Sequence, residues 1–377
     1  MRLRPTFAQI DLSALKHNYN RVLRSLPKNC GVLAVVKADA YGHGAVTVAK
    51  ALEGLGTAGL GVATVEEGVE LRQAKVAAKV LILQGLLGMG EAAAKVLLEH
   101  KLTPVIHNVS TLSLWNSLGG SRDRRLPVHL KLDTGMTRLG VTSKGLALLL
   151  ETLQKCPALK LEGVMTHLAF REDEKYTRHQ LKLFNEMGEQ IQKIFGKVPV
   201  GHIANSAAVM NGSPVTMDWA EKCWARPGIM LYGIPPYPAY AGKGDLEPVM
   251  RLVSQIALTK NVPAGTKVSY NCTFTTTRPT RIGVVPIGYA DGYPFSASGK
   301  AKVLVEGKRL PVLGRVTMDL IMIDLTDLPA AQVGSEVVLI GKQKQAAITA
   351  DELAEWSGTI AYEIVTRVSK RIPRIYS

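Results

Sequence analysis

The residues of this sequence best suited to chemistry lie at the ends of separate apolar runs. Lys37 and His167 each end such a run, Asn205 and Ser206 directly follow another, and Arg226 lies within the last one. Together they supply an amine, an imidazole, a guanidinium, an amide and a hydroxyl. These groups can act on one molecule if the fold brings the ends of the runs to one edge.

Lys37 suggests a specific chemistry. A lysine at the inner end of a buried strand must be neutralised, paired or covalently bound, and such amines form Schiff bases. Ser206 and the backbone amides of Gly228 and Ile229 could bind a phosphate. An amine facing a phosphate site suits pyridoxal 5′-phosphate, which must be held at both ends. The alternative is a lysine that reaches solvent at the rim of the fold.

The elements that must position these residues alternate between two kinds of pattern. Short runs rich in Val, Ile and Leu are followed by longer amphipathic stretches, which is typical of β-α units around a parallel sheet. The pattern predicts a (β/α)8 barrel of the TIM type, with a doubly wound open sheet as the alternative. The expected strands are residues 32–37, 60–64, 80–84, 103–107, 127–132, 161–167, 200–204 and 224–231.

The pattern changes after the Pro-rich segment 235–238. The helical period disappears and short alternating runs with Gly turns follow, apart from a helical stretch at 349–357. We therefore expect two domains: a cofactor-binding barrel over residues 1–238 and a mostly β domain over residues 239–377. Residues 1–12 are candidates to pack with the second domain.

Composition excludes several classes of protein. The 377 residues are 46% hydrophobic and 20% charged, which indicates a compact soluble chain. Lys and Arg number 46 against 31 Asp and Glu, a formal charge of +15, but the basic clusters are short and lack interleaved aromatic residues, so we expect no nucleic-acid partner.

Other signals point the same way. No apolar segment is long enough to predict a membrane span, and the N-terminus lacks the apolar core of a secretory signal, so a cytoplasmic location is expected. The four dispersed cysteines fit that location, and no metal-ligand spacing is present. The segment GLGTAG at 54–59 matches a dinucleotide fingerprint, but it follows a helix and precedes a strand, the reverse of the required order.

A series of motifs resembles the alanine racemases, in the same order and over nearly the whole chain. The first is the lysine motif VVKADAYGHG at residues 35–44. The others are KLDTGMTRLG at 131–140, TH at 166–167, ANSA at 204–207, RPGIMLYG at 226–233, GRVTMD at 314–319 and YE at 362–363.

The resemblance implies roles for individual catalytic residues. Lys37 would carry pyridoxal 5′-phosphate as an internal aldimine and act as the acid or base on one face of the substrate. Tyr270 would be the base on the opposite face, as a two-base racemisation requires. His167 would bridge Arg226 and Tyr270 by hydrogen bonds. Arg226 would face the pyridine nitrogen and leave it unprotonated, because a guanidinium does not readily give up its proton.

The remaining implied residues bind the cofactor and the substrate. Arg138 and the Met318 amide would receive the substrate carboxylate. The cofactor would be held by Lys37, Tyr41, Asn205, Ser206, Arg226, Gly228, Ile229 and Tyr362. The resemblance also implies a homodimer with shared active sites, in which Tyr270 and Met318 come from the other subunit.

The implied activity is the interconversion of L-alanine and D-alanine, supplying D-alanine for peptidoglycan of the cell wall. A racemase of broader specificity, for serine or basic amino acids, is the alternative. Asn271 and Cys272 stand where relatives usually have Gly-Arg, and Arg171 where small or acidic residues are usual. Lys131 could carry a carbamate that orients Arg138, or form a simple ion pair.

Overall fold

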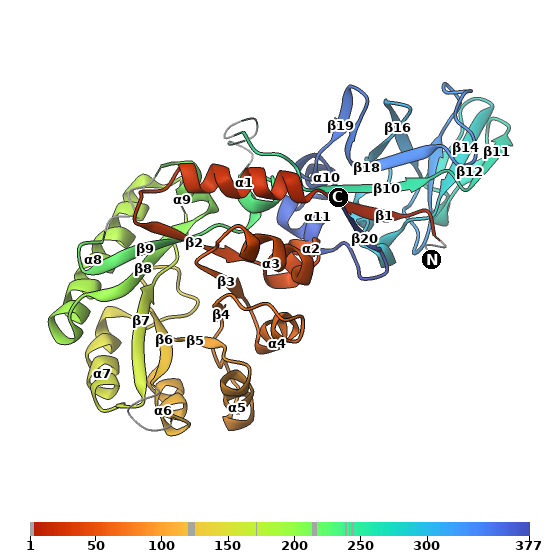
Figure 1. The fold of residues 1–377 in the computed structure, drawn as a ribbon. Coiled ribbons are helices and arrows are strands. Elements are labelled where there is room, and N and C mark those ends of the chain that lie inside the picture. Colours follow the sequence, from red (N-terminus) through yellow and green to blue (C-terminus); the bar gives the residue numbers. More distant parts are fainter. Residues whose placement is uncertain are drawn as a thin grey trace.

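The N-terminal half of the protein is a closed barrel of eight parallel strands (Figure 1). The computed structural model describes residues 4–119, 125–170, 172–212, 217–237, 240, 242 and 245–377. The barrel confirms the predicted fold and rules out the open sheet. Its strands are β2 (Cys30–Val35), β3 (Gly59–Val62), β4 (Val80–Ile82), β5 (Thr103–Ile106), β6 (Leu126–Lys131), β7 (Leu159–Met165), β8 (Val198–Asn205) and β9 (Ala220–Arg226).

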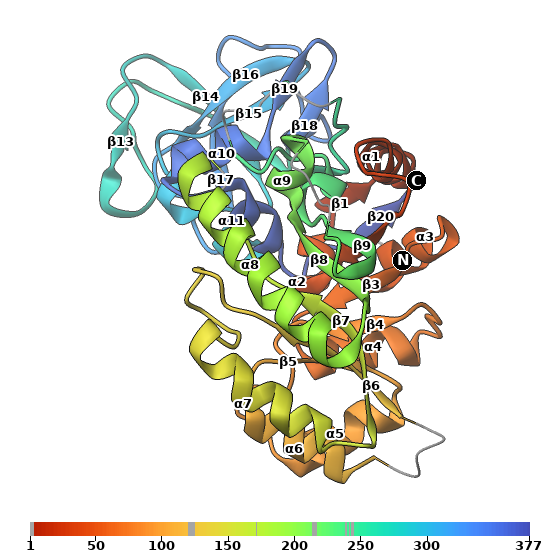
Figure 2. The same cartoon turned by 90° about the vertical axis from the view of Figure 1, so that its left-hand side faces the viewer.

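Helices surround the barrel, as a parallel sheet buried on both faces requires. Strands β3, β4 and β5 have every residue buried, which explains their continuous apolar runs. Figure 2 shows the long α8 running beside the strands. The helices of this half are α1 (Leu12–Arg24), α2 (Lys37–Gly42), α3 (Ala45–Gly54), α4 (Val65–Gln73), α5 (Glu91–Glu99), α6 (Val109–Ser117), α7 (Ser143–Gln154), α8 (Glu174–Phe195) and α9 (Ser206–Met210).

Seven of the eight barrel strands end one to five residues earlier than the pattern predicts, and two of them carry residues of the expected site. β9 stops at Arg226, whereas the expected strand ran to residue 231. Pro227 has no N–H to donate to a neighbouring strand, and the apolar residues after it form a buried 3-10 turn, Ile229–Tyr232. β2 stops at Val35, so Lys37 begins the following turn. Apolar character predicted burial correctly but not the backbone conformation.

The C-terminal half is built on a sheet of ten strands, ordered β11-β14-β17-β16-β15-β18-β10-β1-β20, with β19 paired to β18. It confirms the predicted mostly β domain. Its strands are β1 (Phe7–Ile10), β10 (Met250–Gln255), β11 (Leu258–Val262), β14 (Thr280–Val285), β15 (Lys302–Val305), β16 (Lys308–Leu313), β17 (Ile321–Asp324), β18 (Glu336–Gln343), β19 (Ala346–Ile348) and β20 (Arg374–Tyr376). A small sheet, β12 (Lys267–Val268) with β13 (Phe274–Thr275), and the helices α10 (Ala350–Ser357) and α11 (Ala361–Thr366) complete it.

The N-terminal segment belongs to this second sheet. Strand β1 pairs antiparallel with β10 and parallel with β20, so residues 7–10 lie among strands from the other end of the chain. The proposed division at residues 238 and 239 lies outside the described residues. No helix in the described ranges is long and apolar enough to cross a membrane.

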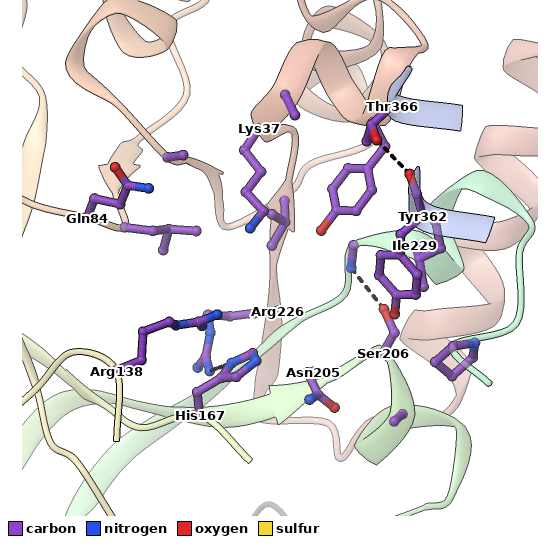
Figure 3. A pocket seen from close by; sticks show the side chains of 18 of the residues that line it. Lys37, Gln84, Arg138, His167, Asn205, Ser206, Arg226, Ile229, Tyr362 and Thr366 are labelled. Carbon is purple, nitrogen blue, oxygen red and sulfur yellow. Dashed lines mark hydrogen bonds between the residues drawn. The ribbon is translucent and has the colours of Figure 1, made fainter. Parts of the chain in front are cut away.

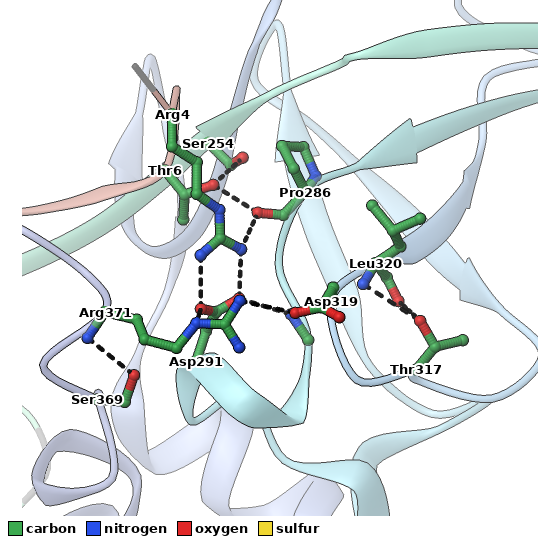
Figure 4. A network of polar contacts seen from close by, with 11 residues as sticks. Arg4, Thr6, Ser254, Pro286, Asp291, Thr317, Asp319, Leu320, Ser369 and Arg371 are labelled. Carbon is green, nitrogen blue, oxygen red and sulfur yellow. Dashed lines mark hydrogen bonds and ion pairs between the residues drawn. The ribbon is translucent and has the colours of Figure 1, made fainter. Parts of the chain in front are cut away.

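A buried carboxylate ties the two ends of the chain together (Figure 4). The Asp291 side chain is fully buried and accepts hydrogen bonds from both Nη atoms of Arg4 and, at 3.1 Å, from the Gly288 amide. Arg371, near the C-terminus, lies 3.5 Å from the same carboxylate and donates to Asp319 at 2.7 Å. A buried charge is tolerated only with such partners.

We expect Asp291→Asn to destabilise the full chain by roughly 1–3 kcal/mol, because the amide lacks the charge and the second acceptor oxygen that Arg4 uses. Thermal unfolding followed by calorimetry measures the change. Asp327→Asn is the matched control, since it removes a carboxylate from an exposed pair with Arg278 and should leave Tm unchanged. Equal melting temperatures for the two variants would contradict the assignment.

Candidate active site

A cavity of about 750 Å³ opens at the C-terminal ends of the barrel strands (Figure 3). This is the edge where the strand-end residues were expected to meet, and its size suits a cofactor together with a small substrate. The predicted residues that line it are Lys37, Tyr41, Arg138, His167, Asn205, Ser206, Arg226, Gly228, Ile229 and Tyr362, together with Lys131.

Lys37 projects into this cavity from the turn that follows β2. Burial lowers the pKa of its amine, the positive charge of Arg138 lowers it further, and the carboxylate of Glu67 opposes both effects. A lower pKa makes more of the unprotonated amine available at neutral pH. The site therefore favours the form of lysine that attacks a carbonyl group.

Hydroxyl groups gather on the wall next to Lys37. The Ser206 Oγ accepts hydrogen bonds from the amides of Gly228 at 3.0 Å and Met230 at 3.4 Å. Tyr41 is buried against the same turn, and burial raises its pKa to about 12, so it stays a neutral donor. Burial likewise raises the pKa of Tyr362, whose ring centre lies 6.2 Å from that of Tyr41.

Gly228 makes this wall possible. A Cβ atom at position 228 would lie 2.3 Å from the Tyr41 hydroxyl, far inside van der Waals contact. Only glycine therefore lets the Tyr41 hydroxyl approach the 228–230 backbone. Hydroxyls and backbone amides packed in this way are donors suited to an anion such as phosphate.

Arg226 lines the floor of the cavity and is buried. Its guanidinium donates to the backbone oxygens of His202 at 2.6 Å and Thr166 at 2.5 Å, and its Nη2 lies 3.5 Å from His167 Nδ1. Burial lowers the pKa of Arg226 to about 9, which still leaves it charged at neutral pH.

His167 is held neutral beside that charge. Burial, followed by the charge of Arg226, lowers the pKa of His167 well below its ordinary value. A neutral imidazole can accept from Arg226 through Nδ1 while Nε2 keeps its proton. Through this pair, the charge of Arg226 could strengthen a hydrogen bond that His167 Nε2 donates to a bound ligand.

Lys131 and Arg138 add two more basic side chains to the lining of the cavity. Burial, followed by the charges of Arg226 and Arg138, lowers the pKa of Lys131 to about 8. No carboxylate in the described ranges lies within ion-pair distance of Lys131, and Asp133 instead accepts from the amides of Gly135 and Thr137 at 3.0 Å. The simple ion pair considered for Lys131 is therefore not formed. The cluster suits an anionic substrate group such as a carboxylate.

Tyr270 and Met318 do not reach this cavity within one chain. Both belong to the second domain and are exposed, Tyr270 to 70% and Met318 to 51%. Asn271, beside Tyr270, adopts a φ of 58°, a conformation that favours Gly or Asn, which explains why Asn can stand where relatives usually have Gly. Arg171 lies outside the described residues.

Sequence reasoning missed several residues of the cavity, among them Gln84 and Tyr237. Gln84 follows β4, so the strand-end rule that selected Lys37 could have found it. Tyr237 comes from the segment after the barrel, and no signal in the sequence indicated that it folds back. Among the described residues, no cluster of three His, Cys, Asp or Glu could hold a metal ion.

Comparisons with known proteins agree with this arrangement. Residues 10–236 match the family model for the N-terminal domain of alanine racemase, and residues 249–376 match that for the C-terminal domain. The chain is 41% identical to the alanine racemase of Halothermothrix orenii over 375 residues, covering 99% of this chain and 97% of that protein. It is 40% identical to that of Geobacter sulfurreducens over 382 residues, covering 100% and 98%.

Solved structures give the same result. The alanine racemase of Clostridium difficile 630 superimposes with a TM-score of 0.90 at 34% identity, covering 100% of this chain and 97% of that one. The alanine racemase of Bacillus anthracis, solved with bound L-Ala-P, gives a TM-score of 0.89 at 35% identity, covering 100% and 96%. Both domains and the whole length of the chain are matched, and the chain therefore belongs to the alanine racemase family.

Proposed function

We propose that this protein interconverts L-alanine and D-alanine with pyridoxal 5′-phosphate as its cofactor. The observation that carries the proposal is the amine of Lys37 inside a cavity whose neighbouring wall is built of hydroxyls and backbone amides. Family membership and relatives named alanine racemase support alanine as the substrate. No feature of the site favours serine or a basic amino acid.

The residues present fit this cofactor. Lys37 would bind it covalently, Asn205 would lie beside it, and Arg226 would face its ring nitrogen. The phosphate would be held by Tyr41, Ser206, Gly228, Ile229 and Tyr362. The space that Gly228 leaves for the Tyr41 hydroxyl is the specific feature that supports a phosphate at this wall.

When bound, pyridoxal phosphate withdraws electrons from the amino acid and so acidifies its α-hydrogen. Arg226 keeps its proton at neutral pH and can only donate to the ring nitrogen, so it does not protonate it. Arg138 would bind and orient the substrate carboxylate. Lys37, with its lowered pKa, can take or return a proton at Nζ on one face of the substrate.

Racemisation needs a second acid or base on the opposite face. We assign it to Tyr270, with the Met318 amide beside Arg138 at the carboxylate. Because both residues are exposed and lie outside the cavity of their own chain, we propose that a second copy of the chain supplies them. The working unit would be a homodimer with two shared active sites. In each site, His167 would bridge Arg226 of its own chain and Tyr270 of the other chain.

Two further proposals follow, the first in keeping with the four dispersed cysteines and the second with family membership. We place the protein in the cytoplasm, and we assign its D-alanine to peptidoglycan of the cell wall.

Incubating the purified protein with pyridoxal phosphate and L-amino acids in heavy water tests the reaction. We expect D-alanine to form fastest and to carry deuterium at its α-carbon, because the proton removed on one face is replaced from a group that exchanges with solvent. Chiral chromatography with mass spectrometry measures both properties. A different preferred amino acid would refute the substrate, and the absence of any exchange despite bound cofactor would refute the activity.

The shared site is tested by pairing two inactive variants, Lys37→Ala and Tyr270→Phe. Each alone should lose roughly 10²–10⁴-fold or more in turnover, since each lacks one acid or base. A hybrid dimer, co-expressed with two different tags and purified on both, should regain about half of the wild-type activity, because one of its two sites is intact. If each chain used its own Tyr270, both sites of the hybrid would be broken and the hybrid would stay inactive.

A further inference from the structure

The backbone directly after Lys37 has an uncommon conformation. Four successive residues, Ala38 to Tyr41, lie in the left-handed helical region, with φ between 52° and 55°. This turn places Lys37 in the cavity and Tyr41 in the hydroxyl-rich wall.

Left-handed backbone is costly when the residues carry a Cβ atom. Residues other than glycine therefore adopt this conformation singly, and four in succession are rare. The surrounding structure must therefore hold the turn in place, as is typical of strained segments at functional sites.

The C-terminal end of the turn has several partners. The amide of Ala45 donates to Asp39 at 2.8 Å, and His43 Nδ1 lies 2.9 Å from the Tyr41 oxygen. Arg374, from strand β20, donates to the Gly42 oxygen through two nitrogen atoms at 3.0 and 3.1 Å.

The N-terminal end, next to Lys37, is held by Glu67 on α4. One carboxylate oxygen of Glu67 accepts from the Ala38 amide at 2.7 Å. The other accepts from the amides of Ala63 at 2.6 Å and Thr64 at 3.3 Å, as part of a capping box at the start of α4. Both oxygens are therefore used, and the side chain links the end of β3 to the start of the left-handed turn.

We propose that Glu67 is a positioning residue for Lys37, holding the start of the left-handed turn by its bond to Ala38 and keeping a negative charge close to the Lys37 amine. The inference rests on the proposed function only in taking Lys37 as the cofactor lysine. The bond to Ala38 sets the direction from which the lysine enters the cavity. The charge tunes how much of the amine is protonated.

The electrostatic surroundings show why a carboxylate is needed here. Lys37 shares the cavity with Arg138, Lys131, Arg226 and the neutral His167, so its amine lies among positive charges. Other carboxylates near this turn and cavity are engaged elsewhere. Asp39 lies 3.8 Å from Arg374, and Glu363 lies 3.2 Å from Arg367. Glu67 is the carboxylate whose charge raises the pKa of Lys37 against the lowering by burial and Arg138.

Three substitutions separate the two parts of this role. Glu67→Gln keeps the length of the side chain but removes the charge and one acceptor oxygen. Glu67→Asp keeps the charge but shortens the reach to Ala38. Glu66→Gln is the matched control, because Glu66 is an exposed carboxylate in the same first turn of α4 and lines no part of the cavity.

The first measurement is the protonation of Lys37 in the full chain after removal of cofactor. Acetic anhydride labels free amines, and mass spectrometry of the Lys37 peptide gives the pH midpoint of labelling. For Glu67→Gln we expect this midpoint to fall by about half a pH unit, because a negative charge near the amine is lost. At any pH below the midpoint, roughly threefold more of the amine would then be unprotonated. Glu66→Gln should match the wild type, and Glu67→Asp should lie close to it.

The second measurement is the dissociation constant for pyridoxal phosphate in the same proteins. We expect Glu67→Gln and Glu67→Asp each to weaken binding by about tenfold, equivalent to about 1.4 kcal/mol, through the loosened turn, while Glu66→Gln has no effect. Identical labelling midpoints and affinities for Glu67→Gln and Glu66→Gln would overturn the inference. If even the wild type failed to bind pyridoxal phosphate, the proposed cofactor would be wrong, whereas the labelling midpoints would still decide whether Glu67 acts on Lys37.

Discussion

The site depends above all on one buried charge, the guanidinium of Arg226. A charged group without solvent is tolerated only if its donors are satisfied, and the backbone oxygens of Thr166 and His202 accept from it. Thr166 directly follows β7, His202 lies in the second half of β8, and Arg226 itself ends β9. One side chain thereby links three neighbouring strands. It also sets the electrostatics of the cavity, because its charge contributes to the lowered pKa values of His167 and Lys131.

A second constraint is the strained turn after Lys37. Four successive left-handed residues follow Lys37, and the last of them is Tyr41. Within this one turn, both the lysine and the tyrosine face the same cavity. An ordinary right-handed turn would direct the following side chains elsewhere. The contacts that hold the turn come from α4 on one side and from β20 on the other, so two segments far apart in the sequence contribute to its conformation. The C-terminal strand is thus part of the support of the site.

Much of the site could be predicted from the sequence, because strand ends in a parallel barrel meet at one edge. That rule selected Lys37, His167, Ser206 and Arg226, and the cavity contains all four. It did not predict where β9 ends, since apolar residues after Pro227 are buried in a 3-10 turn as well as they would be in a strand. It also did not indicate Glu67, whose place in an amphipathic helix looks like an ordinary capping residue until the fold brings Ala38 against it.

The sequence by itself determined the barrel, the second β domain and the types of residue at the strand ends, because apolar periodicity and local turn residues depend on neighbours along the chain. The tertiary structure alone decided which groups face each other: the guanidinium of Arg226 against the imidazole of His167, the hydroxyl of Tyr41 against Gly228, and the first strand beside the last. It also showed that Tyr270 stands outside the cavity of its own chain. Contacts between residues far apart in sequence follow from how whole elements pack, and burial and charge at the site follow from those contacts.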